Sequence, residues 1–163
     1  MANNEKGYAG EWLAKEYIHS LNMTCLQPDW IMRDPNTEKY FVCEMKNKNV
    51  YTKTLRNGSK WYGMGLPIYQ VEARLQLQKD KDMRVLLLWT DVELCDTIGK
   101  KWLDVVFHRA WLDELEQSMD YYEIPHPKNG GAPIRIYNVQ LFTQSTVRVD
   151  ARKLREKLIE CSK

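Results

Sequence analysis

Two carboxylates and one amine within residues 28–46 are the side chains whose types and spacing most clearly suit a chemical reaction. Asp29 follows Pro28, and Glu44 is followed two residues later by Lys46. This is the only Pro-Asp in the sequence and the only place where an acid precedes a Lys by two positions. Paired carboxylates bind a divalent cation, and an ammonium beside them offsets charge on a phosphate, so the set indicates metal-dependent phosphodiester hydrolysis.

A turn signal at residues 34–36 predicts a β-hairpin that carries these groups. The hairpin is expected to comprise segments 25–33 and 39–48. Residues 40–46 are rich in aromatic and β-branched residues, as strands are, and residues 29–33 are apolar in the middle. The sequence Asp-Pro-Asn between them is a strong turn signal. We expect Asp34 to pair with Lys39 across a four-residue loop. The two residue numbers of each opposed pair in the hairpin then sum to 73.

That pairing frame sets Asp29 directly opposite Glu44. Opposed Cβ atoms lie about 4.5–5.5 Å apart, a separation that one divalent cation bridges. Because side chains alternate along a strand, Glu44 and Lys46 share a face and Met45 points the other way. Opposed carboxylates repel each other unless they are neutralised, and Mg²⁺ or Mn²⁺ would neutralise them through the oxygen ligands that both ions prefer. The alternative is an exposed hairpin whose charges are simply solvated.

Length and composition indicate a single domain, 1–163, with a real hydrophobic core. Hydrophobic residues make up 44% of the 163 residues, and the net charge of +2 restricts any nucleic-acid surface to a local patch. The four cysteines are scattered, which favours a cytoplasmic setting, in a cell or in the host of a phage. No apolar run approaches the ~18 residues of a membrane span. The three histidines lack a Ser or Cys partner at the spacing of a hydrolytic triad.

Periodicity and turn signals predict an α/β fold with a mixed central β-sheet flanked by helices. Residues 83–90 are almost continuously apolar, which suits a strand buried on both faces. Asp150 is a suitable N-cap for the last helix. Residues 49–64 are expected to be irregular and polar. The other expected elements are helices at 8–21, 66–79 with Pro67 in its first turn, 109–118 and 150–161, strands at 101–107 and 134–142, and a loop at 125–133.

The segment between Met45 and Val71 contains no acidic residue, a strong local bias in a nearly neutral chain. Basic side chains contact phosphates and aromatic rings stack on exposed bases, so we expect this segment to border the site and bind nucleic acid. Gly58, Gly63 and Gly65 indicate a mobile loop that orders on binding. The alternative is a solvated surface loop. The candidate nucleic-acid contacts are Lys48, Lys53, Arg56, Lys60, Trp61 and Tyr62.

Two helices that flank the hairpin each present a polar residue with a candidate catalytic role. Glu11 lies at the head of the apolar stripe of helix 8–21, and its alternative role is that of a first-turn acid that favours the helix dipole. Gln70 lies on a flank of helix 66–79, where it could hold the attacking water or a phosphate oxygen, or be an ordinary surface residue. The residues alone leave both alternatives open.

The combination of these features resembles the PD-(D/E)xK nuclease superfamily, which has the restriction-endonuclease-like fold and includes Holliday-junction resolvases and phage nucleases. The resemblance covers roughly the first half of the chain and depends on the order, spacing and context of motifs that are not specific one by one. Asp34 is a second candidate for the aspartate of the family, although its Asp-Pro-Asn setting favours a turn. The matches are Glu11 for the helix acid, Pro28-Asp29 for the Pro-Asp element, Glu44-Met45-Lys46 for the acid-x-Lys triplet and, more weakly, Gln70 for the Gln of the following helix.

The resemblance implies an endonuclease that depends on Mg²⁺ or Mn²⁺, hydrolyses phosphodiester bonds in DNA and leaves a 5′-phosphate. It implies that Asp29, Glu44, Glu11 and the backbone carbonyl of Met45 bind the metal. It also implies that Lys46 orients the attacking water and stabilises the transition state.

The substrate and the assembly are open at this point. A compact chain without a separate recognition domain favours an enzyme directed by the structure of junctions or branched DNA, as in recombination and repair, and RNA is not excluded. Nucleases of this kind are often homodimers. The alternatives are a catalytically inactive nucleic-acid-binding module of the same fold and a structural or protein-interaction domain.

Overall fold

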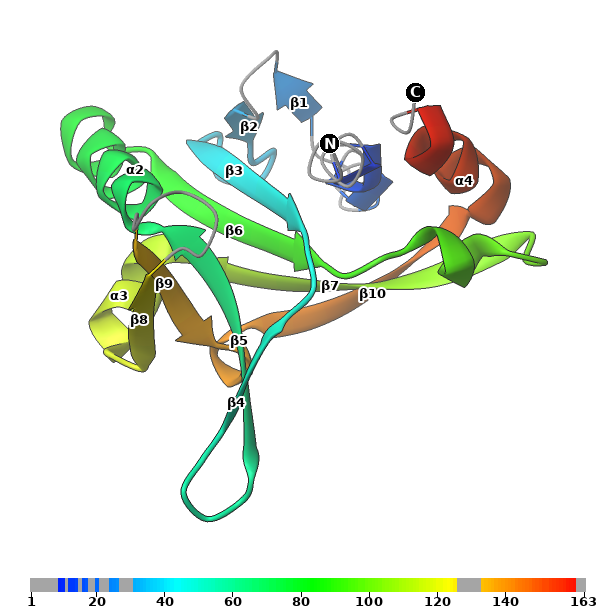
Figure 1. Ribbon diagram of the computed structural model, residues 1–163. Coiled ribbons are helices and arrows are strands. Elements are labelled where there is room, and N and C mark those ends of the chain that lie inside the picture. Colours follow the sequence, from blue (N-terminus) through cyan, green and yellow to red (C-terminus); the bar gives the residue numbers. More distant parts are fainter. Residues whose placement is uncertain are drawn as a thin grey trace.

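Two curled β-sheets with helices packed on them form the described part of the chain (Figure 1). The computed structural model describes residues 9–10, 12–14, 16–17, 20, 24–26, 31–125 and 133–160. The six-stranded sheet has the order β1 (Thr24–Leu26), β2 (Ile31–Arg33), β3 (Tyr40–Asn47), β6 (Arg84–Thr90), β7 (Trp102–Trp111) and β10 (Thr143–Asp150). The four-stranded sheet has the order β4 (Tyr51–Thr54), β5 (Lys60–Pro67), β9 (Pro133–Asn138) and β8 (Tyr121–Pro125).

The helices connect and cover these strands. The described residues between 9 and 20 are helical, which confirms this part of the helix predicted at 8–21. The remaining helical elements are α2 (Ile68–Lys81), α3 (Leu112–Ser118), α4 (Ala151–Glu160) and the 3₁₀ helices η1 (Leu94–Thr97) and η2 (Val139–Leu141).

The six-stranded sheet is mixed, as the order of elements predicts. Strand β3 pairs with β6 in parallel, and the other neighbouring strands of this sheet pair antiparallel. The chain passes through the second sheet and α2 between β3 and β6, because a parallel pair needs a crossover connection. The architecture is therefore α/β, and the second sheet is an addition that the single-sheet expectation did not include.

Strand β6 separates two hydrophobic cores, as its continuous apolar sequence predicts. Its side chains alternate between the two faces of the sheet. Leu88 belongs to the core that includes Tyr17 and Leu154, whereas Leu87 and Trp89 belong to the core that includes residues of α2, α3 and the second sheet. We name these the helical-side core and the second-sheet-side core.

Each face of the six-stranded sheet has a different cover. The N-terminal helical residues and α4 pack on the helical side, whereas α3 and the second sheet lie on the other side (Figure 1). On α4, Ala151, Leu154 and Leu158 are buried. Asp150 Oδ1 accepts hydrogen bonds from the backbone N–H groups of the two helical residues at 152 and 153, so the predicted N-cap is confirmed.

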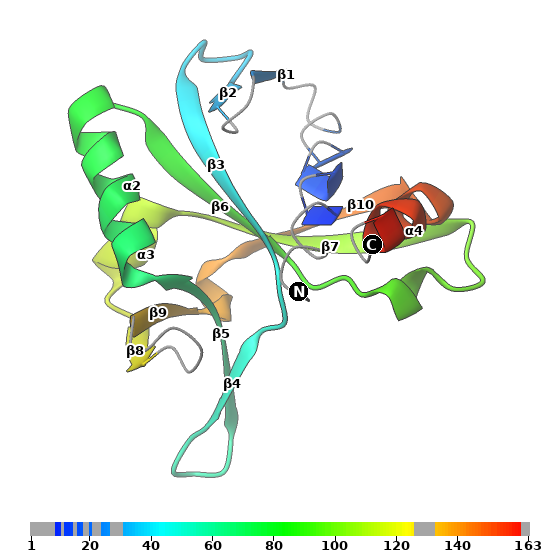
Figure 2. The same cartoon turned by 45° about the horizontal axis from the view of Figure 1, so that its top comes forward.

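Residues 49–64 are not irregular: they form most of the β4–β5 hairpin, which extends away from the rest of the molecule (Figures 1 and 2). The prediction was wrong because Gly63 and Gly65 are strand residues. A Cβ on Gly63 would lie 2.3 Å from an atom of the Trp61 ring, and one on Gly65 would lie 2.8 Å from Ile134. These glycines allow close packing within the sheet, whereas Gly58 has the turn conformation with φ +81°.

Two other boundaries differ from the predictions, and two strands, β8 and β10, were not predicted. Pro67 ends β5 and is the N-cap of α2, which begins one residue later. Residues 109–111 continue β7 because Arg109 and Trp111 pair with β6, and α3 begins only at residue 112. Strands β8 and β10 lie at sheet edges; β8 has only five residues, and most of the polar residues of β10 are exposed, so its apolar signal is weak.

Candidate active site

The β2–β3 hairpin has the predicted pairing frame over all of its described pairs. The pairs are Ile31 with Val42, Met32 with Phe41 and Arg33 with Tyr40, and each sums to 73. The backbone N–H of Asp34 donates to the carbonyl of Lys39 at 2.9 Å, which closes the predicted loop. The turn chemistry at 34–36 thus determines the register of β3, and with it the direction of every β3 side chain.

Asp34 performs the turn role that its sequence setting favours. Its two carboxylate oxygens accept hydrogen bonds from the backbone N–H of Asn36 at 2.9 Å and the hydroxyl of Thr37 at 3.0 Å. These hydrogen bonds lower the pKa of Asp34, because they stabilise its charged form. Asp34 is therefore engaged by the turn.

The first strand of the predicted hairpin is interrupted. Instead of one strand over 25–33, β1 and β2 pair antiparallel, with Leu26 opposite Ile31, so the chain reverses direction between them. Strand β2 is therefore only three residues long. Asp29 belongs to residues 27–30 and lies outside the described residues, so its pairing with Glu44 stays a prediction that extends the observed frame by two positions.

Glu44 and Lys46 share the face of β3 that looks toward the second-sheet-side core, and they form an ion pair. Lys46 Nζ lies 2.6 Å from Glu44 Oε1, and both side chains are largely buried, with exposed fractions of 18% and 13%. Met45 points to the opposite face and packs on the helical-side core, as predicted. Alternation along β3 thus presents the acid and the amine of the triplet together.

Arg74 of α2 completes this cluster, although no sequence pattern predicted a role for it. Its Nε and Nη2 atoms donate to Glu44 Oε2 at 3.0 and 2.9 Å. Val71, three residues earlier on α2, is fully buried in the second-sheet-side core and holds the helix against β3 and β6. The only signal in the sequence was the i, i+4 spacing between Gln70 and Arg74, which places both on one side of the helix.

Gln70 contributes a buried oxygen to this side of the helix. Its Oε1 atom accepts no hydrogen bond from any residue that the structure describes. A buried acceptor that lacks a donor carries a desolvation penalty unless something binds it. Gln70 thus adds an unused oxygen on the side of α2 that carries Arg74.

The electrostatics of Glu44 follow from its burial and its two cationic partners. Burial by itself would raise the pKa of Glu44, but the charges and hydrogen bonds of Lys46 and Arg74 outweigh it and hold the pKa below its usual value. The nearby Lys48 ammonium has a lowered pKa, chiefly from burial and also from repulsion by Lys46. Glu44 is therefore ionised at neutral pH.

We expect Glu44 to stabilise the fold in a pH-dependent way. Because its folded pKa lies below its unfolded pKa, its contribution is fully present at neutral pH and is lost as the pH falls through the folded pKa, from about pH 5 downward. Urea unfolding in EDTA should show the difference in unfolding free energy between wild type and Glu44→Gln shrinking from pH 7 to pH 3. Arg74→Gln should move this loss to higher pH. A difference that is the same at both pH values would contradict the assignment.

Two contacts fix the chain where it leaves the cluster. The buried Asn47 side chain donates to the carbonyl of Val92 at 3.2 Å and accepts from its N–H at 2.9 Å. The indole N–H of Trp89 donates to the carbonyl of Lys48 at 2.6 Å. The end of β3 is therefore tied to β6 and the residues after it, so Lys46 projects from a rigid strand.

The described residues of the N-terminal helix pack on the other side of the sheet. Ala9, Leu13 and Ala14 pack in the helical-side core. A Cβ on Gly10 would lie 3.2 Å from Asn47 Cβ, so the helix passes close to the end of β3. Glu11 lies outside the described residues, and its role as a metal ligand stays a prediction.

The candidate nucleic-acid contacts divide between the two faces of the β4–β5 hairpin. Lys53 is opposite Trp61, and both face Tyr122. Lys53 Nζ lies 4.5 Å from the centre of the Tyr122 ring, and the Trp61 ring lies 4.9 Å from it, centre to centre. These two side chains are engaged in the hairpin itself.

The candidate residues Arg56, Lys60 and Tyr62 are more accessible. On β5, Lys60 and Tyr62 share a face with Met64, whose side chain enters the second-sheet-side core. Tyr62 is 43% exposed, and Arg56 lies in the exposed turn of the hairpin. Tyr62 is therefore the more accessible aromatic residue of the candidate set.

The donor chemistry of the cluster suits a hard cation only in part. Glu44 and Gln70 offer the oxygen atoms that Mg²⁺ and Mn²⁺ prefer. However, Lys46 contacts one carboxylate oxygen of Glu44 and Arg74 contacts the other. Among the described residues, no group of three or more His, Cys, Asp or Glu is placed to hold a metal ion. Asp29 and Glu11, which the resemblance assigns to the metal, are outside those residues.

Comparisons with known proteins provide no further assignment. None of the described helices is long and apolar enough to cross a membrane. No family model, curated protein or solved structure matches the chain.

Proposed function

We propose that this protein is a metal-dependent endonuclease that hydrolyses phosphodiester bonds in DNA, with a site of the PD-(D/E)xK type. The observation that supports it most strongly is the contact of 2.6 Å between Lys46 Nζ and Glu44 Oε1 on a largely buried sheet face. The pairing frame that the sequence predicts for the hairpin also holds over its described pairs. A buried acid and amine two residues apart on one strand are the core of the family motif.

In this proposal Asp29, Glu44, Glu11 and the Met45 carbonyl would hold Mg²⁺ or Mn²⁺. When bound, the ion would supply an activated water and would polarise the scissile phosphate. Lys46 orients the attacking water and offsets the charge that develops on the phosphate. Gln70 accepts a hydrogen bond from that water or from a ligand beside it.

Arg74 has a positioning role in the same proposal. Its guanidinium contacts Glu44, and the Arg74 side chain is 38% exposed, which leaves room for contact with a phosphate oxygen. Arginine binds phosphate through two parallel hydrogen bonds. We therefore assign Arg74 to the phosphate next to the scissile bond.

The fold supports binding of nucleic acid beside this cluster. The β4–β5 hairpin begins four residues after Asn47, the last residue of the strand that carries the cluster, and it presents Arg56, Lys60 and Tyr62. Cations on a projecting hairpin contact phosphates, and an exposed ring stacks on bases that are not paired. A structure-directed enzyme that acts on junctions or branched DNA fits this arrangement, and a homodimer would allow two strands to be cut.

A substrate panel tests the proposal. A four-way junction, a flap, a linear duplex, a single strand and an RNA strand are incubated with Mg²⁺, Mn²⁺ or EDTA. The expected result is metal-dependent cleavage that leaves 5′-phosphate ends, with the branched substrates cut fastest. No cleavage of any substrate with either ion would reject the assignment.

The second candidate is a nucleic-acid-binding module of the same fold without catalysis. One specific observation favours it: Lys46 and Arg74 already balance the charge of Glu44. Binding in a salt-sensitive gel shift without cleavage would support this candidate. Binding should weaken as salt rises, because phosphate contacts release counterions.

A further inference from the structure

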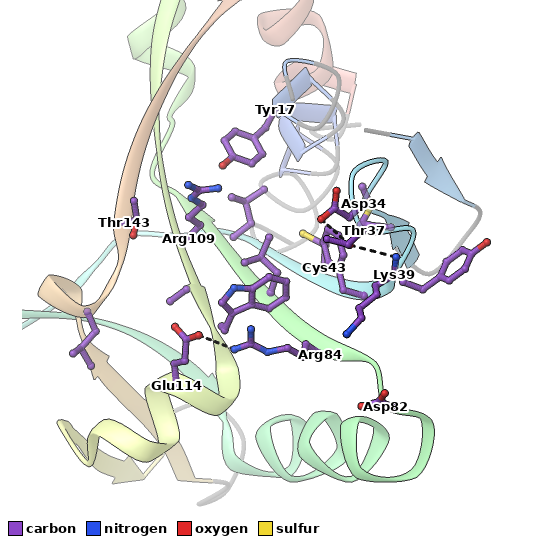
Figure 3. Close-up of a pocket in the computed structure, with 18 residues that line it drawn as sticks. Tyr17, Asp34, Thr37, Lys39, Cys43, Asp82, Arg84, Arg109, Glu114 and Thr143 are labelled. Carbon is purple, nitrogen blue, oxygen red and sulfur yellow. Dashed lines mark hydrogen bonds and ion pairs between the residues drawn. The ribbon is translucent and has the colours of Figure 1, made fainter. Parts of the chain in front are cut away.

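A second candidate site lies on the opposite face of the six-stranded sheet from Glu44 and Lys46. A cavity of about 620 Å³ opens there between the N-terminal helix, the β2–β3 turn and the strands β6 and β7 (Figure 3). This volume is in the range of sites for small organic ligands, about 300–1,000 Å³. Nothing in the nuclease proposal uses it.

The floor of the cavity is a continuous apolar patch of the sheet. Cys43, Leu86 and Trp111 occupy one row across the strands β3, β6 and β7, as the register shows. Leu88 lies in the adjacent row and Phe41 at the next position of this face of β3. A ligand body on this floor would be apolar.

Arg109 interrupts the apolar floor in the adjacent row, the one that contains Leu88. It pairs with Leu88 on one side and Thr143 on the other, and it lines the cavity. Over the described residues, no carboxylate forms an ion pair with Arg109. By contrast Arg84, another cation of the lining, is paired with Asp113 and Glu114 at 2.8 and 2.7 Å. A half-buried guanidinium on an apolar face without an anion is costly unless a ligand supplies the anion.

Tyr17 provides a second unused polar group at the same place. The residue is 1% exposed, and its hydroxyl has no hydrogen-bond partner among the described residues. Figure 3 shows the Tyr17 hydroxyl and the Arg109 guanidinium facing the same part of the cavity. One comes from the N-terminal helix and the other from β7, so tertiary packing brings together two donors for which the described part of the chain provides no acceptor.

We propose that this cavity binds an amphipathic monocarboxylate, with its carboxylate between Arg109 and Tyr17 and its apolar body on the floor of the sheet. A guanidinium and a hydroxyl are donors that match the two oxygens of a carboxylate. A phosphate ester is disfavoured, because Asp34, Asp82 and Glu114 of the lining balance its cations Lys39, Arg84 and Arg109. The lining therefore has no excess of positive charge to offset a second negative charge.

The site is independent of the candidate nuclease centre. Side chains of β3 alternate, so Cys43 faces the cavity while Glu44 faces the other side of the same strand. Binding at the cavity therefore requires no metal and no nucleic acid, and its failure would leave the nuclease proposal untouched.

Titration calorimetry with decanoate below its micellar concentration tests the proposal, with decanol and decyl phosphate as comparison probes. Decanoate should bind at least about tenfold more tightly than decanol, because a charge-assisted hydrogen bond is gained. Arg109→Gln should weaken decanoate binding by about 10- to 100-fold, and Tyr17→Phe by about 3- to 10-fold. Tyr17→Phe should not lower the melting temperature, since the hydroxyl that it removes makes no hydrogen bond.

Two control variants should bind decanoate as wild type does. Lys46→Ala changes the other face of the sheet, and Arg152→Gln removes a cation on α4 that is 76% exposed. Equal affinity for decanoate and decanol would overturn the proposal, as would tighter binding of decyl phosphate. Unchanged affinity in a folded Tyr17→Phe protein would overturn it even if Arg109→Gln does not fold.

Discussion

Replacement of Lys46 by Ala is expected to lower the rate of DNA cleavage by about 100- to 1,000-fold, the usual cost of removing one donor that stabilises a transition state. The Lys46 ammonium lies 2.6 Å from Glu44 and projects from a strand whose end is anchored by Asn47 and Trp89. No other described ammonium occupies that position on β3. Cleavage of the best substrate in Mg²⁺ under single-turnover conditions measures the effect, while a gel shift should show that DNA is still bound.

The matched control for this prediction is Lys79→Ala. Lys79 is an exposed residue in the last turn of α2, so its removal changes the net charge by the same amount without touching the cluster. Its cleavage rate should stay near that of wild type. Wild-type cleavage by a folded Lys46→Ala protein would show that the Glu44–Lys46 pair is not the catalytic centre, even if another part of the molecule cuts DNA.

Arg135→Met is expected to reduce the free energy of unfolding by about 2–4 kcal/mol, because it leaves a largely buried carboxylate without its cation. Arg135 Nη1 lies 2.6 Å from Glu116 Oε2, and these side chains are 16% and 19% exposed. Tyr137 donates to the other oxygen of Glu116 at 2.6 Å. This cluster fastens α3 to β9 of the second sheet. Urea unfolding at pH 7 measures the loss.

Arg148→Met is the control for this stability prediction. Arg148 pairs with Asp104 at 2.8 Å, but the two side chains are 67% and 54% exposed. Exposed ion pairs contribute little because water already solvates both charges. The two arginine variants remove the same functional group, so equal losses of stability would contradict the argument from burial.

Local chemistry explains which parts of the fold could be predicted. The Asp-Pro-Asn turn at 34–36 determines the β2–β3 register through contacts within six residues of chain. Strand β6 could be predicted because burial on both faces requires a continuous apolar run. The N-cap at Asp150 could be predicted because the cap and its donors are adjacent in sequence.

The β4–β5 hairpin and strand β10 were missed for the same reason: both depend on pairing between residues that are far apart in the chain. The β4–β5 hairpin is polar, and its strands are defined by pairing with each other and with β9, about 70 residues later in the chain. Gly63 suggested mobility, but its strand position is explained by the rings and branched side chains that pack over it. Strand β10 forms because β7 offers an edge, and its own sequence carries a weak signal.

The sequence by itself determined the pairing frame of β2 and β3 and the sharing of one face by Glu44 and Lys46, because turn chemistry and strand alternation act over a few residues. Only the tertiary structure brought Arg74 to Glu44, and Tyr17 and Arg109 to one cavity. These residues are separated by 30 and 92 positions in the chain. These residues lie close together because α2 and the N-terminal helix pack on opposite faces of one sheet, and no local sequence pattern encodes that packing.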